Sequence, residues 1–310
     1  MKYSPMLCHL GTEEWTNKKG YIFELKLDGV RAILHKNKKI ELINKKGIFK
    51  SGQYPELLHL GKSIRPKSCV LDGEIIVYNE KGMPDFQMLM KRDHISRKLD
   101  AEIRAKKYPA TYVAFDILEM NGKSLLNTSL TERKEILSKA VIENKNLELI
   151  FSTEKGAELW KEVKKRNLEG IVAKKASSFY HIGQRTWDWG KVKNLNTIDV
   201  IIVGYTTQKR HISSLCMAVY RDDKLTFIGK VGTGFTEKML HDLGLRIEEI
   251  KTSTPSVINP PEGQINWLEP SLVAEVEYLS VTDNEQLRSP SFKRFMDDKT
   301  PKQCTWIDQV

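Results

Sequence analysis

The sequence has few cysteines and no long hydrophobic run. Its four cysteines, Cys8, Cys69, Cys216 and Cys304, lie far apart and form no Cys-x-x-Cys pair. Their spacing therefore supports neither a zinc site nor a disulfide framework. No apolar stretch comes near the roughly 20 residues that a bilayer-spanning helix needs, and the start MKYSPMLCHL lacks the apolar core of a secretory signal. We therefore predict a cytoplasmic protein with no membrane role.

An excess of positive charge is confined to the first part of the chain. Residues 1–193 hold 37 Lys and Arg against 24 Asp and Glu, whereas residues 194–310 hold 13 against 16. A basic region of this size suits a polyanionic partner, although charge that merely keeps a protein in solution gives the same count. Composition alone leaves both interpretations open.

The first 80 residues alternate apolar and polar positions in short runs, which is typical of antiparallel strands. The predicted strands cover residues 21–27, 31–36, 39–44 and 69–79. Between them, Asp28-Gly29 and residues 44–47 have turn chemistry, because glycine accepts backbone angles that other residues resist. This pattern places Lys26 at the end of a strand, beside a tight turn.

Helices and strands mix in the next hundred residues. Helical spacing is present in residues 84–92 and 129–144, the second with Thr131 as its cap, and residues 111–118 are a buried-strand candidate. A further helix is expected to end near Asn167, followed by a strand from Gly170. A last strand over residues 187–194 closes this half.

After Asn194 the pattern changes to short strands with a single helix, which suggests a small barrel. The strands are expected at residues 199–206, 215–221, 224–232 and 271–280, the helix at 236–250 and a long loop at 253–263. The shift in pattern coincides with the shift in charge. We therefore predict an α+β protein with two domains, residues 1–194 and 195–310.

Five short segments, in order along the chain, carry the functional signal. KLDGVR at residues 26–31 would by itself be a solvated hairpin end. It is followed by LDGE (71–74), FDIL (115–118), EGIVAKK (169–175) and WGKVK (189–193). Together these segments resemble the covalent nucleotidyltransferase superfamily of ATP-dependent DNA ligases, RNA ligases and RNA capping enzymes. The resemblance implies an ATP-grasp-like nucleotidyltransferase domain with an antiparallel sheet.

The chemistry of nucleotide transfer explains these residue types. Protonated lysine is a poor nucleophile, with an ordinary pKa of about 10.4, so a site that uses it must surround it with cations or remove it from water. Lys191 and Lys193 could supply those cations. Attack on a phosphate spreads negative charge over its oxygens, which Arg31, Arg185, Lys191 and Lys193 could stabilise. Divalent Mg²⁺ or Mn²⁺ prefers carboxylate oxygens, such as those of Glu74 and Glu169.

The resemblance also implies a role for each matched position. Lys26 matches the lysine that carries AMP, and Glu24 the position that reads adenine. Asp28 would orient or activate the lysine, and Arg31 would face a phosphate of the nucleotide or of DNA. The remaining implied roles are Glu74 at the ribose and metal, Phe115 stacked on the base, Glu169 at the metal, Lys174 in the same motif, and Arg185, Lys191 and Lys193 in the last motif of the domain.

Each of these residues has an ordinary structural alternative when it is considered alone. Phe115 would be core packing, because an aromatic residue in a strand usually is. Glu74 and Glu169 would be charges at the ends of elements, and Lys191 and Lys193 would form a solvated strand face. The ordered set of five segments favours the functional interpretation.

The second half of the sequence indicates which enzyme class of this superfamily the protein resembles. Residues 229–235 (GKVGTGF) and 274–299 resemble the oligonucleotide-binding (OB-fold) β-barrel domain of ATP-dependent DNA ligases, especially the ligase modules of bacterial end-joining proteins. The resemblance implies a DNA ligase (ATP) that acts on nicked or broken duplex DNA in the bacterial nucleoid, as a monomer. Ku and a polymerase module are candidate partners, and repair, recombination and replication are the candidate processes.

Two residues depart from the family pattern. The last motif has Met296 two residues before Asp298, where related sequences have an arginine that contacts the triphosphate; Arg294 could substitute for it. Lys45 stands where the family often has an arginine, and it keeps the charge but loses the two-pronged hydrogen bonding. The pairs Lys209 with Arg210 and Lys293 with Arg294 could give the barrel a basic face for the DNA backbone.

The predicted reaction has three steps. Lys26 takes AMP from ATP, AMP passes to the 5′-phosphate of a nick, and the 3′-hydroxyl displaces AMP. The alternatives are an RNA ligase, a capping enzyme that uses GTP, and a non-catalytic subunit that binds DNA ends.

Overall fold

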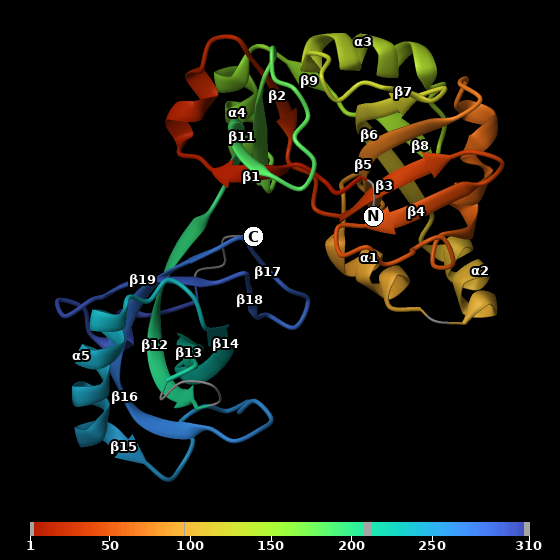
Figure 1. Cartoon of the computed structure of the whole chain (residues 1–310). Coiled ribbons are helices and arrows are strands. Elements are labelled where there is room, and N and C mark those ends of the chain that lie inside the picture. Colours follow the sequence, from red (N-terminus) through yellow and green to blue (C-terminus); the bar gives the residue numbers. More distant parts are fainter. Residues whose placement is uncertain (1–2, 96, 208–211, 307–310) are drawn as a thin grey trace. The chain divides into compact units, whose positions relative to one another are not determined.

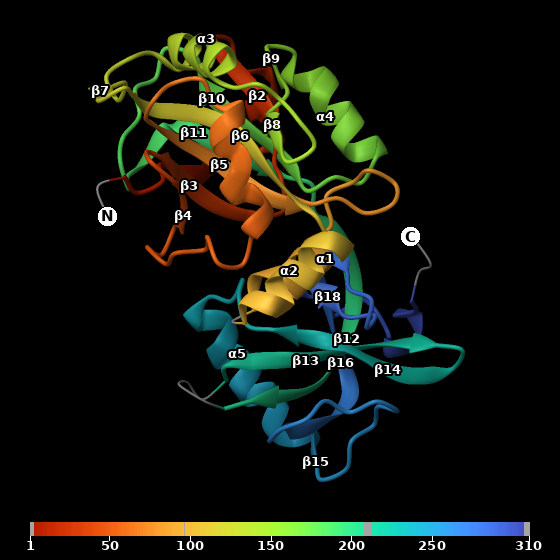
Figure 2. The same cartoon turned by 90° about the vertical axis from the view of Figure 1, so that its right-hand side faces the viewer.

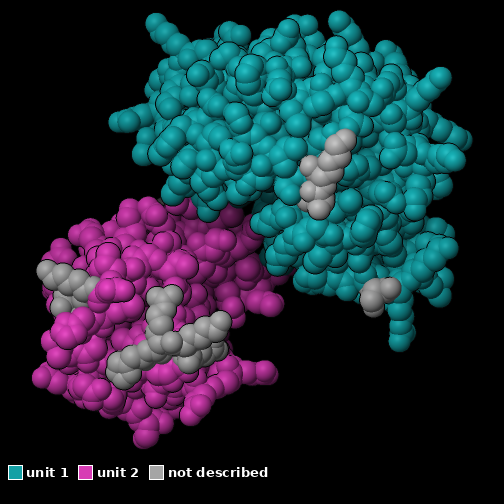
Figure 3. All heavy atoms as spheres, in the orientation of Figure 1, with its two compact units in different colours: residues 1–194 teal, residues 195–310 magenta. Residues whose placement is uncertain are grey.

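The computed structural model describes residues 3–95, 97–207 and 212–306. The chain divides into two compact units, Met1–Asn194 and Leu195–Val310, which Figure 3 colours separately. Each unit is described by itself below. Within the described residues, no helix is long and apolar enough to cross a membrane.

Unit 1 is built on two sheets (Figure 1). The five-stranded sheet has the order β1 (Leu7–Leu10), β11 (Arg185–Lys193), β10 (Gly170–Lys175), β2 (Tyr21–Leu25) and β9 (Ser152–Thr153). The six-stranded sheet has the order β4 (Ile40–Asn44), β3 (Val30–Lys36), β5 (Cys69–Val77), β6 (Ala110–Met120) and β7 (Lys123–Ser124), with β8 (Leu147–Leu149) also paired to β6. Neighbouring strands are antiparallel except for β1 with β11 and β6 with β8, which are parallel. The predicted antiparallel architecture therefore holds for most of the unit.

Four α-helices and two 3₁₀ segments complete unit 1: α1 (Phe86–Asp93), α2 (Lys98–Lys107), α3 (Leu130–Ala140), α4 (Gly156–Lys165), η1 (Glu13–Asn17) and η2 (Pro55–Ser63). Helix α3 lies against β6, and α4 lies against β10 and β2 (Figures 1 and 2). The predicted cap of α3 was wrong: Ser129, not Thr131, accepts from the backbone of Glu132 in a reciprocal capping box. Asn167 has a φ of 47° where the chain turns from α4 toward β10, near the predicted helix end.

The central strands of the six-stranded sheet are apolar on both faces, because a separate core covers each face. Leu71, Ile75 and Ala114 belong to the larger core, whereas Val70 and Leu118 face a smaller core that includes Trp189 of the other sheet. A strand buried on both sides reads as a continuous apolar run rather than an alternating one. This explains why β6 was recognisable as a buried strand from its sequence.

The turn after Lys26 depends on a glycine for a different reason from the one predicted. Gly29 does not have a positive φ. Instead, a Cβ atom there would lie 2.4 Å from the Ile75 carbonyl oxygen and 2.7 Å from the Glu74 side chain. Only glycine therefore lets the chain leave β2 and enter β3 this close to β5. By contrast, Gly47 has a φ of 81° and closes the turn after β4 in the predicted way.

Unit 2 has a curled sheet of the OB-fold kind, as predicted. Its order is β14 (Lys224–Val231), β13 (Ser214–Arg221), β12 (Asn196–Thr206), β16 (Asn266–Tyr278) and β15 (Lys251–Thr252), with β19 (Ser291–Phe295) also on β16. The remaining elements are the hairpin β17 (Ser280–Val281) and β18 (Leu287–Arg288), helix α5 (Glu237–Ile247), η3 (Glu248–Ile250) and η4 (Pro301–Gln303). Leu243 and Ile247 of α5 pack into one of the two cores of this unit.

A buried ion pair ties helix α3 to the six-stranded sheet. Arg133 Nε and Nη2 donate to the two carboxylate oxygens of Asp116, at 2.7 and 2.9 Å, and both side chains are fully buried. Arg133 Nη1 also donates to the carbonyl oxygens of Thr128 and Ser178. Because the donors and the carboxylate satisfy each other, the pair can exist without water, but neither partner can be removed alone.

We predict that Asp116→Ala lowers the free energy of unfolding by about 3–5 kcal/mol, because it leaves the Arg133 charge buried without a partner. Urea unfolding followed by tryptophan fluorescence measures this, since four of the six tryptophans, Trp15, Trp160, Trp187 and Trp189, lie in unit 1. Exposed Glu135→Ala on the same helix is the control and should change little. Replacing both partners, Asp116→Leu with Arg133→Met, should recover much of the loss; an equal loss in the double variant would contradict the proposed cause.

Candidate active site

Unit 1 contains a cavity of about 780 Å³ that is walled by residues of both sheets. The segment that follows β2 and carries Lys26 also joins the two sheets, so the lysine lies where they meet. Ten of the twelve predicted site residues line the cavity: Glu24, Lys26, Asp28, Arg31, Lys45, Glu74, Phe115, Lys174, Arg185 and Lys191. Glu169 reaches Lys26 directly, whereas Lys193 is not among the described residues that form the wall.

Lys26 is held at its backbone and at its side chain. Its backbone N–H donates to the carbonyl of Gly170 at 2.9 Å, which continues the pairing of β2 with β10. Its Nζ lies 2.6 Å from Glu169 Oε1. The side chain of Lys26 is 22% exposed, so it can be reached from the cavity. Glu169, the residue before β10, therefore fixes the Lys26 amine at the end of β2.

A buried carboxylate and two lysines lie at one side of the cavity. Glu24 is only 2% exposed, and its Oε2 lies 2.6 Å from Lys174 Nζ, while its Oε1 pairs with Lys134. Burial by itself would raise the pKa of Glu24, but the two lysines outweigh it and hold the pKa below its ordinary value. Burial lowers the pKa of Lys174 in spite of Glu24. Sequence reasoning did not find Lys134, because only the packing of α3 on β6 brings it here.

The aromatic residues of the cavity lie next to cations. Lys174 Nζ is 4.2 Å from the centre of the Phe115 ring and 4.3 Å from that of Trp189, within the range of cation–π attraction. The guanidinium of Arg31 lies 5.2 Å from the Phe115 ring. Trp189 is almost fully buried, and its Nε1 has no hydrogen-bond acceptor in the part of the chain that the structure describes. A ligand oxygen in the cavity could satisfy this donor.

Arg31 is a fixed cation in the wall. Its Nε and Nη2 donate to the two carboxylate oxygens of Asp72 at 3.0 and 2.6 Å, and the Tyr180 hydroxyl also donates to Asp72 at 2.6 Å. Burial opposes the charge on Arg31, but Asp72 more than compensates and keeps the pKa of the guanidinium above its ordinary value. Asp72 belongs to the LDGE segment, yet sequence reasoning assigned a role there only to Glu74.

Further cations gather on β11. Lys191 lines the cavity, and its pKa is lowered first by burial and then by the neighbouring charges of Lys193 and Lys26. Arg185 is exposed at the opening, where its Nη1 donates to the carbonyl oxygen of Cys8. Lys45 is exposed in the turn after β4. The cavity is therefore predominantly cationic, which suits a polyphosphate.

Glu74 and Glu169 are suited to a divalent cation. The pKa of Glu74 is raised to about 8, chiefly by burial; the charges of Arg31 and Lys26 oppose this rise, and the nearby Asp72 and Glu169 add to it. The described residues contain no cluster of three or more metal-ligand side chains. Mg²⁺ is commonly held by only one or two carboxylates together with substrate phosphates, so this donor pair fits such an ion.

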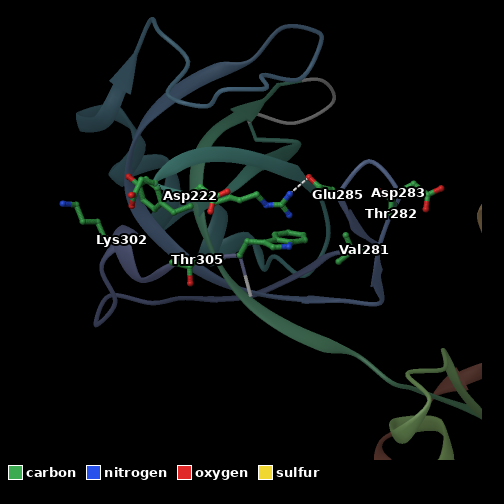
Figure 4. Close-up of a pocket in the computed structure, with 11 residues that line it drawn as sticks. Asp222, Val281, Thr282, Asp283, Glu285, Lys302 and Thr305 are labelled. Carbon is green, nitrogen blue, oxygen red and sulfur yellow. Dashed lines mark ion pairs between the residues drawn. The ribbon is translucent and has the colours of Figure 1, made fainter. Parts of the chain in front are cut away.

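Unit 2 has a cavity of a different character, about 1160 Å³ in volume (Figure 4). Four acidic residues contribute to its wall: Asp222, Asp223, Asp283 and Glu285. Arg221 pairs with Glu285 and stacks at 4.7 Å over the Trp306 ring. Arg221 and Lys302 are the basic residues of this wall, so its acidic residues outnumber its basic ones, which suits a phosphate less well than the cationic cavity of unit 1 does.

The basic face predicted for unit 2 is neutralised where it is described. Lys293 Nζ lies 2.8 Å from Glu277, and Arg294 Nε lies 2.8 Å from Glu275. The other predicted pair, Lys209 with Arg210, lies outside the described residues. Met296, at the position of the missing arginine, packs against the core cluster that contains Val273 and Cys304.

Comparisons with known proteins agree with the architecture of both units. Residues 5–193 match the family model described as ATP dependent DNA ligase domain, and residues 208–299 match the ATP dependent DNA ligase C terminal region. The chain is 34% identical to the SPbeta prophage-derived DNA ligase-like protein LigB of Bacillus subtilis, over 94% of this chain and 98% of that protein. It is 31% identical to the multifunctional non-homologous end joining protein LigD of Mycolicibacterium smegmatis, over 98% of this chain but only 40% of LigD.

Among solved structures, a mycobacterial DNA ligase D complexed with ATP and MES superimposes with a TM-score of 0.56 at 28% identity, covering 98% of each chain. The two matched domains together extend across most of the sequence, and the first of them contains the whole cavity around Lys26. The chain therefore belongs to the ATP-dependent DNA ligase family.

Proposed function

We propose that this chain seals nicks between a 5′-phosphate and a 3′-hydroxyl in DNA by carrying AMP on Lys26. The observation that supports this most directly is the position of the Lys26 amine, which lies in a cationic cavity beside Glu169 and close to a buried carboxylate that can select a base. No other lysine of the cavity lies at the joint between the two sheets, among the residues that the structure describes.

The first step joins Lys26 to AMP. The neutral amine attacks the α-phosphorus of ATP, the bond between that phosphorus and the bridging oxygen breaks, and pyrophosphate leaves as the amine loses a proton. Arg31, Arg185 and Lys191 lie in the wall of the same cavity and would stabilise the charge on the phosphate oxygens. Arg31 is already oriented by Asp72, so little reorganisation is needed.

Base selection rests on Glu24 and Phe115. A carboxylate can only accept hydrogen bonds, so Glu24 suits the exocyclic amino group of adenine and not the carbonyl at the same position of guanine. The flat ring of Phe115 offers a stacking surface once the base displaces the Lys174 ammonium from it. Glu24 and Phe115 can therefore accommodate adenine, and the match to the ATP-dependent DNA ligase domain supports ATP rather than GTP as the nucleotide.

Glu74 and Glu169 would hold a Mg²⁺ or Mn²⁺ ion together with phosphate oxygens. When bound, such an ion neutralises the charge of the phosphates. Glu169 is engaged by Lys26 at 2.6 Å in the free protein, so a cation at Glu169 would compete with the amine for this carboxylate. Asp28 lies in the turn beside Lys26 and would orient the amine.

In the second and third steps, AMP passes from Lys26 to the 5′-phosphate of DNA and is then displaced by the 3′-hydroxyl. We place this activity in DNA repair. The match to the ligase portion of LigD supports end joining of broken duplexes, with Ku or a polymerase module as partner and with localisation at the nucleoid. The match over nearly the full length of LigB supports a ligase that acts without such modules, as a monomer. Blunt-end joining with and without added Ku separates these two proposals.

Lys26→Ala should abolish covalent labelling by α-labelled ATP, because it removes the attacking nitrogen. The same variant should still seal a nick whose 5′ end is already adenylated, since the last step does not use the amine as a nucleophile. Exposed Lys62→Ala is the matched control and should label normally. Supplying ATP or GTP, and nicked DNA or nicked RNA, tests the alternative enzymes.

A label that persists in Lys26→Ala would overturn the proposed nucleophile. A wild-type chain that binds nicked DNA but never becomes labelled would favour the non-catalytic alternative instead.

The raised pKa of Glu74 predicts a pH dependence of stability in the absence of metal. Between the ordinary value of 4.5 and about 8, the folded chain keeps a proton that the unfolded chain has released. Stability contributed by this proton is complete below pH 4.5 and is lost as the pH rises to about 8. Glu74→Gln should remove this loss, so the variant should gain stability relative to wild type as the pH rises.

Urea unfolding at pH 5, 6.5 and 8 without divalent cations measures the difference between the two chains. Exposed Glu80→Gln provides a control of the same chemistry. Parallel pH profiles for wild type and Glu74→Gln would contradict the assignment.

A further inference from the structure

A flat aromatic surface lies on the five-stranded sheet, outside the cavity. The Trp187 ring stacks on His9 with their centres 3.9 Å apart and their planes at 3°. Trp187 and the adjacent Leu10 are both 66% exposed. We call His9, Leu10 and Trp187 the aromatic shelf. An exposed tryptophan in a parallel stack with another ring is unusual on a protein surface, because its apolar faces gain nothing from water.

An irregularity in the pairing of β1 with β11 creates the shelf. Cys8 pairs with Thr186, but the next residue, His9, pairs with Gly190, so three residues of β11 bulge between these pairs. Within the bulge, Trp187 is exposed against His9, while Trp189 is buried over Lys174. A bulge re-aims side chains in this way without ending the strand.

The surface beneath the shelf is rigid. Trp15 is 8% exposed, and its ring centre lies 6.2 Å from that of Trp187. Any Cβ atom at Gly190 would lie 2.3 Å from Trp15, so the indole fills the space that this glycine leaves. On its other flank, Lys18 Nζ lies 3.1 Å from the centre of the Trp15 ring. Little conformational entropy is therefore lost when a ligand stacks on the shelf.

The shelf is continuous with the opening of the cavity. Leu7 and Cys8 line the cavity, and His9 and Leu10 follow them on β1; Arg185 lines it two residues before Trp187. At about 3.3 Å per strand residue, the shelf begins roughly 3 Å beyond the cavity wall along β1 and roughly 7 Å beyond it along β11. DNA that presents its 5′-phosphate to Lys26 would therefore pass the shelf within a few nucleotides of the break.

We propose that the aromatic shelf stacks on an unpaired nucleobase next to the break, so that the protein prefers ends with an unpaired base over fully paired nicks. This inference rests on the proposed function. Aromatic side chains bind bases through their faces, and in a continuous duplex those faces are covered by neighbouring base pairs. A base becomes available only where the duplex is interrupted and a nucleotide is unpaired or displaced.

The charges around the shelf agree with a nucleic-acid ligand. Lys18 and Arg185 flank it, and its nearest acidic neighbour along the chain, Asp188, lies 3.8 Å from Lys175 and 3.9 Å from His181. The Lys175 ammonium therefore lies within ion-pair distance of the only carboxylate next to Trp187 along the chain. Stacking supplies no sequence preference, which suits an enzyme that must accept any break.

The test compares two DNAs that carry a 3′-dideoxy end so that neither can be sealed. One has a four-nucleotide overhang with 2-aminopurine at its junction, and the other is a nicked duplex without unpaired bases. Trp187→Ala should weaken binding of the overhang by about 5- to 100-fold, the range expected for one base–aromatic stack, and should leave binding of the paired nick within about twofold. Wild type should quench the 2-aminopurine fluorescence, and Trp187→Ala should not.

Three controls separate the shelf from the rest of the site. Trp187→Phe should keep most of the affinity, because a stacking ring remains. Phe179→Ala removes an exposed aromatic residue that lies outside both the cavity and the shelf, and should bind both DNAs like wild type. Covalent labelling by ATP in the absence of DNA should be the same in Trp187→Ala as in wild type. If wild type itself were not labelled, that result would contradict the proposed function and not the role of the shelf.

Equal losses on both DNAs would overturn the proposal, because they would indicate contact with the backbone. Unchanged binding of both DNAs would overturn it as well. In that case, a lower sedimentation coefficient for Trp187→Ala than for wild type would assign the shelf to a contact between two copies of the chain.

Discussion

The candidate site depends on buried carboxylates that are each held by a cation from a distant part of the chain. Glu24 is held by Lys174 and Lys134, Asp72 by Arg31, and Asp116 by Arg133. An unpaired charge at these positions would be strongly destabilising, because removing an ion from water costs on the order of several kcal/mol. These ion pairs therefore fix several side chains at once, and they connect β2, β3, β5, β6, β10 and α3 within unit 1. The same interactions that allow the sheets to pack also orient the groups that would meet the nucleotide.

This organisation explains how the free protein can hold so many charges ready for a polyphosphate. Arg31 donates two hydrogen bonds to Asp72, and Lys174 lies next to Glu24 and two aromatic rings. Both side chains are already held in place by these contacts, so little movement of either cation is needed when a ligand binds. Glu74 is different, because no cation of the protein balances it well enough to keep its pKa low. A carboxylate in that condition would gain more from a bound cation than one already paired with a lysine or arginine would, which is consistent with the metal role proposed for Glu74.

Much of this could be predicted from the sequence, and the rest depended on contacts between distant segments. Local alternation was sufficient to place β2 through β5 and to put Lys26 at a strand end, and a continuous apolar run placed β6, because strand patterns are set by neighbouring residues. The resemblance supplied Glu24, Glu74 and Glu169, but it did not supply Lys134 or a role for Asp72, since their partners are set by packing. Gly29 shows the same limit: its turn was predictable, whereas its actual constraint is the nearness of β5. The bulge that exposes Trp187 left no local signal either, because a register shift is a property of two paired strands.

The two units differ in how their charged residues are arranged. Unit 1 concentrates cations in its cavity and along β11, whereas the described basic residues of β19 in unit 2 are neutralised by Glu275 and Glu277. Its cavity is acidic as well. Met296 is partly buried and packs against one of the two cores of unit 2, at the position where the family resemblance led us to expect an arginine. In the proposed reaction, the cations that would face the triphosphate are those of unit 1, where Arg31, Arg185 and Lys191 line the same cavity as Lys26.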